Sequence, residues 1–166
     1  MALFRPKEII QRFDSFDINK YRELGFNAIL VDIDNTIAYP DKEISASLEA
    51  INFINSLKEN GFKVILMSNN TRRRVKPYAD SLNIDFNYWS FKPLPFSYLY
   101  IIYKYNLDRK KVISFGDQLI TDCLGANLVG IYPIYVKQLV PEDTRMTRIN
   151  RLLERFIFKF ILHEKV

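Results

Sequence analysis

Two aspartates separated by one residue follow a short apolar run in the first quarter of the chain. The run is Ala28 to Val31, and the acids are Asp32 and Asp34. A continuous apolar run with β-branched members is typical of a strand that is buried on both faces of a parallel sheet. In open α/β sheets, ligands bind beyond the carboxyl ends of the strands. The two carboxylates are therefore predicted to lie where a reaction could take place.

Phosphoryl transfer is the chemistry that two such acids could carry out. An aspartate can attack phosphorus to form an aspartyl-phosphate, which divides one difficult displacement into two easier steps. We assign this role to Asp32. A second carboxylate can protonate the leaving oxygen and later take a proton from the attacking water, and we assign that role to Asp34. The alternative is a simple acidic turn, where Asp and Asn are common because they bond the local backbone.

Three further strand ends carry residues that a phosphoryl-transfer site needs. Ser68 can donate a hydrogen bond to a phosphoryl oxygen, and Lys92 can offset the charge of the phosphate and of the attacking carboxylate. Asp117, Asp32 and a backbone carbonyl near Asp34 would suffice for Mg²⁺, which takes oxygen ligands and usually binds through one or two carboxylates plus the phosphate. Each residue alone could be a helix cap, a surface charge or a turn. Their order after four strands favours a catalytic site.

The elements that would position these residues alternate between strand and helix. Apolar runs predict strands over residues 28–31, 64–67, 86–89, 112–115 and 131–136. Helical spacing and end signals predict helices after Ser45, from Thr71 to about Leu82, from Pro95 to Tyr105 and around Gly125. Such alternation indicates an α/β fold with a doubly wound parallel sheet and helices on both faces. Residues 1–25 are expected to form a helical lead-in that packs against the sheet edge.

Length and composition indicate a single globular domain over residues 1–166. The chain is 48% hydrophobic and 26% charged, and its length suffices for a substantial core. The net charge of +5 favours an anionic partner, such as a phosphate ester, an acidic membrane surface or nucleic acid. The single cysteine, Cys123, excludes an intrachain disulfide and a zinc site with several thiolates. The sequence has no G-x-S-x-G elbow or phosphate-binding P-loop, so serine hydrolases and P-loop nucleotidases are not supported.

The sequence gives no sign of export or of membrane insertion. Charges at Arg5, Lys7 and Glu8 interrupt what would be the apolar region of a signal peptide. The longest uncharged stretch, residues 123–136, is well short of the ~20 apolar residues that a spanning helix needs. We expect no transmembrane helix and a cytoplasmic location, with peripheral contact at the inner face of the membrane as an option.

These motifs resemble those of the haloacid dehalogenase superfamily of aspartate-nucleophile phosphatases. Its four signatures stand here as D-I-D-N-T from Asp32 to Thr36, Ser68, Lys92, and Gly116-Asp117 with Asp122. The resemblance implies a sheet of order 3-2-1-4-5, a magnesium ion and the roles assigned above. It also implies that Asp122 helps to hold the metal shell or Lys92, and it makes Thr36, Asn69 and Gly116 supporting residues.

A narrower resemblance is to the bacterial YqeG family of capless phosphatases. It rests on V-D-I-D-N-T, M-S-N-N-T-R-R-R-V, F-K-P, G-D-Q-L-I-T-D and T-R-I-N-R-L-L-E-R, and it covers residues 5–160. YqeG proteins are in turn similar to the mitochondrial phosphatidylglycerophosphate phosphatases of fungi and plants, which makes that lipid of phosphatidylglycerol synthesis the leading substrate. The alternatives are a soluble or protein phosphomonoester, and a scaffold without activity that binds an acidic partner such as ribosomal RNA.

Motif spacing leaves no room for a cap domain. The chain between Thr36 and the second strand accommodates one helix, and the chain between Ser68 and Lys92 accommodates one helix and a strand. A site without a lid cannot exclude water by closing over a small substrate. A large substrate, such as a lipid head group at a membrane, could cover the opening itself. A short loop or a second subunit could instead supply a partial lid.

Two basic segments bear on the partner. One follows Ser68 near the predicted mouth and contains Arg72, Arg73 and Arg74. These arginines could hold a second phosphate or an acidic membrane, although a solvated helix face is the commoner meaning of such a run. The other is residues 145–166, whose spacing predicts a basic amphipathic helix with Arg151 and Arg155 on its polar side. That helix could dock on a membrane or pack on the protein's own sheet.

Overall fold

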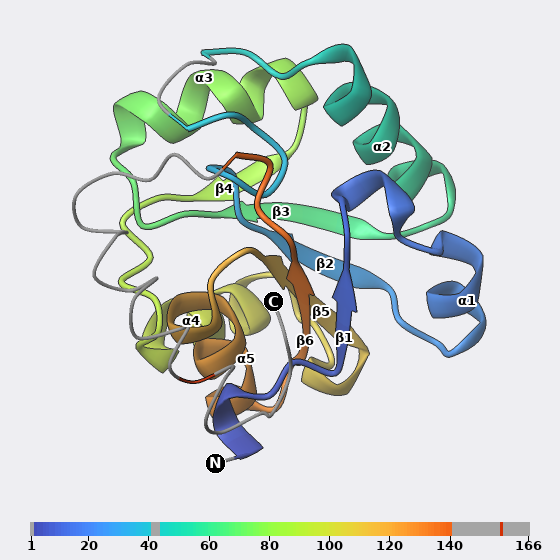
Figure 1. Cartoon of the computed structure of the whole chain (residues 1–166), viewed down its shortest axis with the longest axis vertical. Helices are drawn as coiled ribbons and strands as arrows, with labels where there is room; N and C mark the ends of the chain where they lie inside the picture. The colour runs from blue at the N-terminus through green and yellow to red at the C-terminus, as the bar shows by residue number, and fades with distance from the viewer. Residues whose placement is uncertain (1, 41–43, 141–156, 158–166) are drawn as a thin grey trace.

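A six-stranded parallel sheet forms the centre of the molecule, with strand order β1-β6-β5-β2-β3-β4 (Figure 1). The computed structural model describes residues 2–40, 44–140 and 157. The strands are β1 (Glu8–Ile10), β2 (Ala28–Val31), β3 (Lys63–Met67), β4 (Asp85–Asn87), β5 (Val112–Gly116) and β6 (Tyr132–Val136). The helices are α1 (Ile18–Glu23), α2 (Leu48–Glu59), α3 (Arg72–Leu82), α4 (Pro95–Lys104) and α5 (Leu124–Val129). Shorter helical turns cover Ala2–Phe4, Phe13–Ser15, Arg109–Lys111 and, as a π-helical turn, Leu119–Cys123.

Strand β2 lies in the interior of the sheet, as its apolar sequence predicts. It pairs in parallel with β3 on one side and β5 on the other, and all four of its residues are buried. Without β1, the order is β4-β3-β2-β5-β6, which is the predicted 3-2-1-4-5 arrangement. The predicted doubly wound α/β fold is therefore confirmed, and the carboxyl end of β2 lies between those of β3 and β5.

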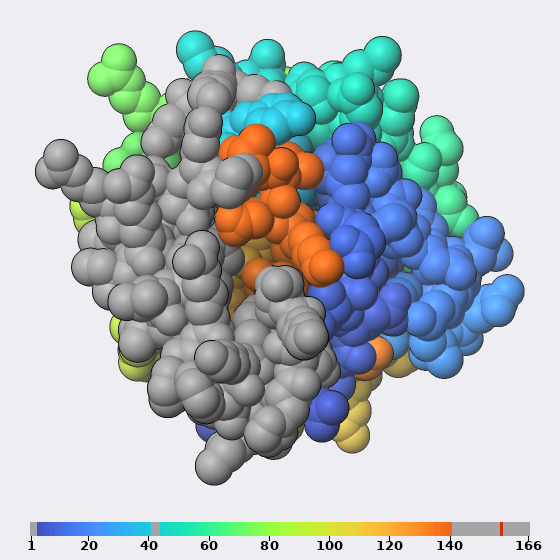
Figure 2. All heavy atoms as spheres, viewed as in Figure 1, coloured from blue at the N-terminus to red at the C-terminus, as the bar shows by residue number. Residues whose placement is uncertain are grey.

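The N-terminal segment differs from the helical lead-in predicted for residues 1–25. Glu8–Ile10 forms a parallel edge strand against β6, with Ile9 opposite Tyr135. Figure 2 shows this blue segment lying directly against the orange chain at the end of β6. A three-residue strand is too short to show an alternating pattern, and its backbone partners come from β6, far away in sequence. Local sequence therefore could not reveal it.

Helices cover both faces of the sheet (Figure 1), and alternate residues of β2 and β3 face opposite cores. Ile29 and Val31 of β2 pack with side chains of α2 and α3. Leu30 of the same strand packs with side chains of α4 and α5. Because both faces of β2 are covered, its continuous apolar run matches its burial.

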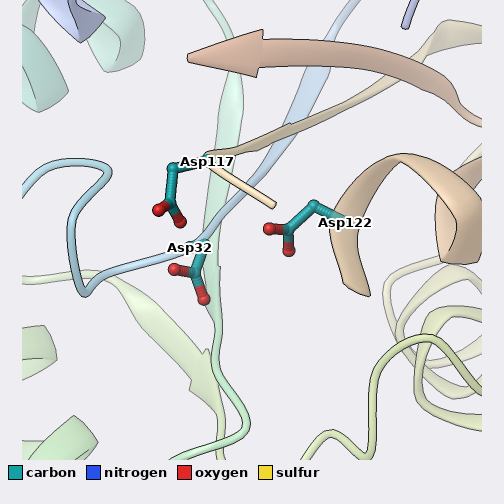
Figure 3. Close-up of side chains that lie close together, drawn as sticks. All are labelled: Asp32, Asp117 and Asp122. Carbon is teal, nitrogen blue, oxygen red and sulfur yellow. The ribbon is translucent and has the colours of Figure 1, made fainter. Parts of the chain in front are cut away.

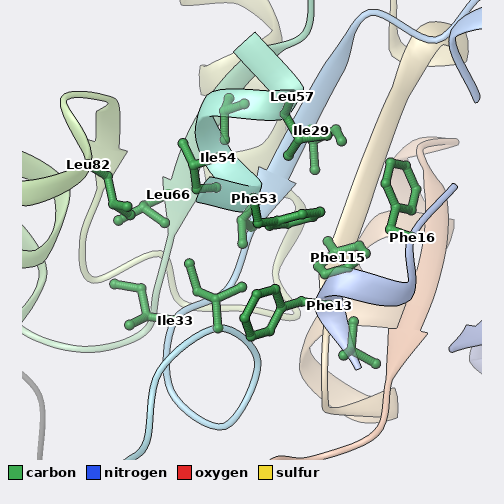
Figure 4. Close-up of a cluster of buried hydrophobic side chains, with 14 of the residues drawn as sticks. Phe13, Phe16, Ile29, Ile33, Phe53, Ile54, Leu57, Leu66, Leu82 and Phe115 are labelled. Carbon is green, nitrogen blue, oxygen red and sulfur yellow. The ribbon is translucent and has the colours of Figure 1, made fainter. Parts of the chain in front are cut away.

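Aromatic side chains fasten the N-terminal segment to the first of these cores. Phe13 and Phe16 lie beside Phe53 of α2 and Phe115 of β5 (Figure 4). The ring centroids of Phe13 and Phe53 are 5.3 Å apart, and those of Phe16 and Phe115 are 5.6 Å apart in an edge-to-face arrangement. Such pairs favour one defined geometry. Part of the chain's high phenylalanine content is explained by this cluster.

Two predicted element boundaries shift for local reasons. The helix predicted after Ser45 begins at Leu48, because the side chain of Ser47 accepts the Ala50 N–H and caps it. The strand predicted over residues 86–89 is β4, which ends at Asn87. Trp89, with φ of +48°, adopts the left-handed conformation and leaves the sheet.

Each connection near the site holds a single helix. Within residues 2–40 and 44–140, α2 joins β2 to β3 and α3 joins β3 to β4, with no further domain inserted, as the motif spacing predicts. Among the helices of these residues, none combines the length and hydropathy needed to cross a bilayer. The amphipathic helix predicted over residues 145–166, with Arg151 and Arg155, lies outside the described residues except for Ile157. That side chain is buried against Leu119 and Tyr135.

Candidate active site

Three carboxylates meet beyond the carboxyl ends of β2 and β5. Asp32 directly follows β2, Asp117 follows β5, and Asp122 lies in the π-helical turn. Figure 3 shows the three side chains lying close together, and one oxygen of each lies within 4.8 Å of the others. Asp117 and Asp122 are buried, and Asp32 is 9% exposed. Carboxylate oxygens are the ligands that Mg²⁺ prefers, so this donor set fits a magnesium ion.

Lys92 joins two of these acids. Its Nζ lies 2.6 Å from an Asp32 oxygen and 2.6 Å from an Asp122 oxygen. Burial of Lys92 acts to lower its pKa, but the carboxylates of Asp122 and Asp32 outweigh burial and raise the pKa above the ordinary lysine value. Lys92 is therefore an ammonium ion that offsets part of the negative charge of the site.

Asp32 is held in an environment that disfavours its charge. Burial raises the pKa of its carboxyl group to about 7, the Lys92 ammonium opposes this rise, and the Asp122 carboxylate adds to it. A nucleophilic aspartate has to be ionised. A divalent cation beside Asp32 would favour the ionised form, because opposite charge stabilises a carboxylate.

Asp122 is fixed by its own turn. Its second oxygen accepts hydrogen bonds from the Gln118 N–H at 3.1 Å and the Thr121 hydroxyl at 3.3 Å. Gly116 makes room for it, because a Cβ atom at that position would lie 2.3 Å from Asp122 Cγ. Glycine is therefore required at the first position of the Gly116-Asp117 signature, because any side chain there would collide with Asp122. Of the two roles that the resemblance implies for Asp122, contact with Lys92 is present as an ion pair.

The loop after β2 curls back on itself and brings Thr36 to Asp117. The Thr36 hydroxyl donates to an Asp117 oxygen at 3.3 Å, and Thr36 is fully buried. Asn35 adopts a φ of +65° in this turn, a conformation that Asn tolerates better than most residues. Its side chain bonds both the N–H and the carbonyl of Val140 at 3.0 Å, which ties the turn to the chain beyond β6.

Ser68 and Asn69 connect the end of β3 to the loop that carries Lys92. Asn69 accepts the Lys92 N–H at 2.7 Å and donates to the Lys92 carbonyl at 3.0 Å, so that its amide fixes the lysine backbone. Ser68 is buried, and its hydroxyl accepts the Asn70 N–H at 3.1 Å. The Ser68 carbonyl accepts the Ser90 N–H at 3.0 Å. Both predicted residues lie at the same edge of the sheet as Asp32.

Asp34 is bonded by side chains at the start of α3 and in the loop before it. Arg74 Nη2 lies 2.6 Å from one Asp34 oxygen, and Asn70 Nδ2 donates to the other at 3.3 Å. The predicted arginine cluster is therefore divided. Arg74 turns inward to Asp34, whereas Arg72 and Arg73 are exposed to solvent.

Comparison with known proteins agrees with this geometry. A family model described as haloacid dehalogenase-like hydrolase matches residues 13–130. The chain belongs to this family. A Bacillus subtilis (strain 168) protein described as "Probable phosphatase YqeG" is 34% identical over 154 residues, which cover 93% of this chain and 89% of that protein. This haloacid dehalogenase-like protein is therefore also a member of the YqeG family, and it is a phosphatase.

Two solved structures share the haloacid dehalogenase-like fold of the chain. An uncharacterized protein from Listeria monocytogenes serotype 4b superposes with a TM-score of 0.56 at 16% identity, covering 78% of this chain and 98% of that one. The core domain of a provisionally assigned phosphoglycolate phosphatase from Streptococcus pneumoniae TIGR4 has a TM-score of 0.51 at 18% identity, covering 78% of this chain and 96% of that one. At these identities the likeness shows the fold alone.

Several contacts of the haloacid dehalogenase-like site were not predicted from the sequence. The Tyr98 hydroxyl of α4 donates to the carbonyls of Thr121 and Asp122 at 3.3 and 3.4 Å, and so supports the turn that carries Asp122. A Cβ atom at position 125 would lie 2.6 Å from the Tyr98 ring, which is too close for any side chain. This contact explains why α5 contains a glycine at that position. The burial of Tyr98 could have been predicted from the sequence, because Tyr98 lies one helical turn before the apolar Ile101 and both are buried.

Proposed function

We propose that this chain hydrolyses phosphomonoesters with the help of magnesium and through an aspartyl-phosphate on Asp32. The three-carboxylate cluster beside a shared lysine is the observation that carries this proposal. The acids fit a magnesium ion, and Lys92 offers a positive charge to a phosphoryl group that approaches Asp32. The family membership of the chain supports the same reaction class.

In the first step, an Asp32 carboxylate oxygen attacks phosphorus and the bond from phosphorus to the ester oxygen breaks. Asp34 gives its proton to the departing alcohol. In the second step, Asp34 takes a proton from a water molecule, which attacks phosphorus and releases inorganic phosphate and the free Asp32 carboxylate. Ser68 and Lys92 hold phosphoryl oxygens in both steps.

Asp32, Asp117 and the backbone carbonyl of Asp34 are the proposed magnesium ligands, with Asp122 as the further acid within reach. The bound ion supplies positive charge that compensates the phosphoryl oxygens. Thr36 holds Asp117 through its hydroxyl, and Asn69 holds the backbone of Lys92. Gly116 leaves the space that Asp122 fills.

We propose phosphatidylglycerophosphate as the substrate. The resemblance of the YqeG motifs to mitochondrial phosphatidylglycerophosphate phosphatases supports this choice. The absence of an inserted domain between β2 and β4 in the described residues also supports it, because an open site admits a head group that stays attached to its lipid. Membrane contact would then be peripheral, through a surface near the mouth.

Hydrolysis of a generic aryl phosphate tests the reaction. Wild-type protein should release phosphate with magnesium and stop when the metal is chelated. Asp32→Asn should abolish turnover, since an amide cannot form the acyl-phosphate, and Asp34→Asn should lose ~10²- to 10⁴-fold. Asp80→Asn, which alters an acid paired with Lys76 on the surface of α3, is the matched control and should keep wild-type rates. Wild-type rates in Asp32→Asn would eliminate this mechanism.

A substrate panel tests the lipid assignment separately. Phosphatidylglycerophosphate in mixed micelles, glycerol phosphate and a nucleoside monophosphate should be compared by kcat/KM. The lipid should exceed the two soluble esters. A soluble ester that equals or exceeds the lipid would leave the phosphatase in place and reject the substrate.

A further inference from the structure

The connection from β4 to α4 and the helix itself present large apolar side chains to solvent. We call this set the aromatic surface, and its members are Trp89, Phe91, Leu94, Phe96, Tyr100 and Tyr103. Phe96 is 72% exposed and Tyr103 is 88% exposed. Single exposed apolar residues are ordinary, but a contiguous group marks an interaction site.

The members of the aromatic surface form two groups that follow each other along the chain, one in the loop before α4 and one on α4 itself. Phe96, Tyr100 and Tyr103 recur at intervals of four and three residues, so they line one side of α4. The rings of Trp89 and Phe91 contact each other edge to face, with centroids 6.0 Å apart. The Phe91 carbonyl accepts the Leu94 N–H at 2.9 Å, which joins the loop to the start of the helix.

The backbone conformation of the loop from Trp89 to Lys92 both exposes the aromatic rings and buries Lys92. Trp89 and Phe91 have φ values of +48° and +50°, which bulky residues rarely adopt. Ser90 and Lys92, which alternate with them, are 1% and 7% exposed. The Trp89 N–H donates to the Asn70 carbonyl at 3.0 Å, so the loop is held in this shape. The backbone thus directs Lys92 into the active site and the two rings into solvent.

The segment that carries the aromatic surface has positive charges only, and Asp85, which precedes it, pairs with Lys63. Residues 86–107 contain no acidic side chain. The Lys104 ammonium lies 5.8 Å from the Tyr100 ring centroid at the end of α4, and Arg72 and Arg73 are exposed at the start of α3. Aromatic rings suit the boundary between head groups and acyl chains, and nearby cations are attracted to anionic lipids. The chemistry therefore complements an anionic bilayer.

We propose that the aromatic surface docks on an anionic phospholipid bilayer and so places the mouth of the active site at the head-group layer. The docking explains how an uncapped site could reach a lipid phosphate, and in that respect it rests on the proposed function. The surface itself requires no turnover. Binding and hydrolysis can therefore be measured independently.

Trp89 provides the direct test, because it is the only tryptophan of the chain. Emission of the full chain should be recorded with vesicles of phosphatidylcholine alone and with vesicles that also contain phosphatidylglycerol. Anionic vesicles should shift the emission to shorter wavelength and protect it from iodide, and lipids brominated on their acyl chains should quench it. Added salt should weaken the response, since it screens the cations.

Three results of the Trp89 measurement would overturn the docking proposal. One is Trp89 emission that does not respond to anionic vesicles. Another is emission that is already characteristic of a buried ring in vesicle-free buffer, because another part of the chain would then cover the surface. The third is a shift that depends on protein concentration without vesicles, which would indicate that a second copy occupies it.

Paired variants locate the surface. Phe96→Gln with Tyr103→Gln keeps Trp89 and uses a good helix former at two exposed positions of α4. This variant should partition onto anionic vesicles at least about tenfold more weakly, because two inserted rings are lost. Leu24→Gln with Leu48→Gln alters equally exposed apolar residues near α1 and α2, away from α4 in Figure 1, and should bind as wild type.

Aryl phosphate hydrolysis and thermal unfolding accompany these measurements. Both should be unchanged in the α4 variant, which shows that fold and site are intact. Equal vesicle binding by the α4 variant and the wild type would reject the docking surface. Vesicle binding by a wild type that hydrolyses no phosphate ester would support docking and reject the proposed function. Hydrolysis of phosphate esters without any response of Trp89 to vesicles would support the proposed function and reject docking.

Discussion

Lys92 shares one ammonium group between two buried carboxylates, those of Asp32 and Asp122. Burying charge is costly unless the charges are paired and hydrogen-bonded, and here each partner has a fixed position. Asn69 fixes the lysine backbone, and the Gln118 N–H fixes Asp122. The result is a preorganised positive charge next to the proposed nucleophile, which is how electrostatic catalysis avoids reorganisation during the reaction.

Arg74 should act as a positioning residue for Asp34. Its Nη2 lies 2.6 Å from the Asp34 carboxylate, so Arg74→Ala should leave that group less well oriented. We expect kcat for an aryl phosphate to fall roughly tenfold with little change in KM, well short of the ~10²- to 10⁴-fold loss expected when the acid itself is removed. Arg74→Lys should restore part of the rate.

Arg72→Ala is the matched control, because that arginine belongs to the same helix but is exposed. It should keep the wild-type kcat. If the two alanine variants behave alike, the contact between Arg74 and Asp34 has no catalytic role.

At the scale of residues, sequence alone predicted the groups at the strand ends but not their partners. Asp32, Ser68, Lys92 and Asp117 could be found because each follows a recognisable apolar run. The inward turn of Arg74 depends on the rotation of α3. Spacing contained a hint, since Arg74 precedes the buried Tyr78 by one turn and stacks on its ring, with 5.4 Å from the guanidinium carbon to the centroid.

At the scale of elements, β1 is the strand that sequence did not predict, and its side chains explain how so short a strand is held. Glu8 of β1 accepts hydrogen bonds from Lys20 Nζ at 2.6 Å and from the Tyr21 hydroxyl, both in α1. Burial of Glu8 acts to raise its pKa, but the hydrogen bonds from Lys20 and Tyr21 lower it below the ordinary value. The ionised form therefore stabilises the contact between β1 and α1.

Glu8→Gln should lower the thermal unfolding midpoint at neutral pH. The contribution of a carboxylate with a lowered pKa is fully present above its unfolded pKa of 4.5 and is lost as the pH falls through the folded value. The difference between variant and wild type should therefore narrow below pH 4.5. Glu59→Gln, at the exposed end of α2, is the control and should show little change. A difference that is constant with pH would mean that charge is not the cause.

At the scale of the whole molecule, the site draws on loops after β2, β3, β4 and β5, so a ligand bound there should stabilise the entire fold. A ligand at 100 times its dissociation constant adds about 2.7 kcal/mol to the free energy of unfolding. For a chain of this size that corresponds to a rise of roughly 5 to 10 °C in Tm. We expect magnesium, added to chelator-treated protein, to produce such a rise.

Asp117→Ala should require a higher magnesium concentration for the same shift, because it lacks one of the proposed ligands. Asp80→Asn should retain the wild-type titration. Identical titrations of Asp117→Ala and wild type would show that Asp117 is not a ligand. This measurement is independent of turnover.

The general architecture was predictable because strands and helices alternate in the sequence, and the family resemblance supplied the strand order. The edge strand β1 was not, since three residues carry no pattern and its partner β6 is distant. The aromatic surface escaped notice for another reason. End signals at Pro95 and Asn106 predicted α4 as a helix, but they cannot distinguish a side that faces the core from one that faces solvent when both are aromatic.

Pairing of β1 with β6 also has a consequence for biosynthesis. Glu8 lies opposite Ile134, so among the strands of the described residues the first to be synthesised can join the sheet only after the last has been made. Translation proceeds at about 5 to 20 residues per second, which is slow compared with hydrophobic collapse. The active site is also completed late, because Asp32 is synthesised well before Asp117, which lies close to it in the fold. A nascent chain that ends before β6 would therefore hold an unpaired β1 and an exposed edge of β5, and unpaired strand edges make a folding intermediate prone to aggregation.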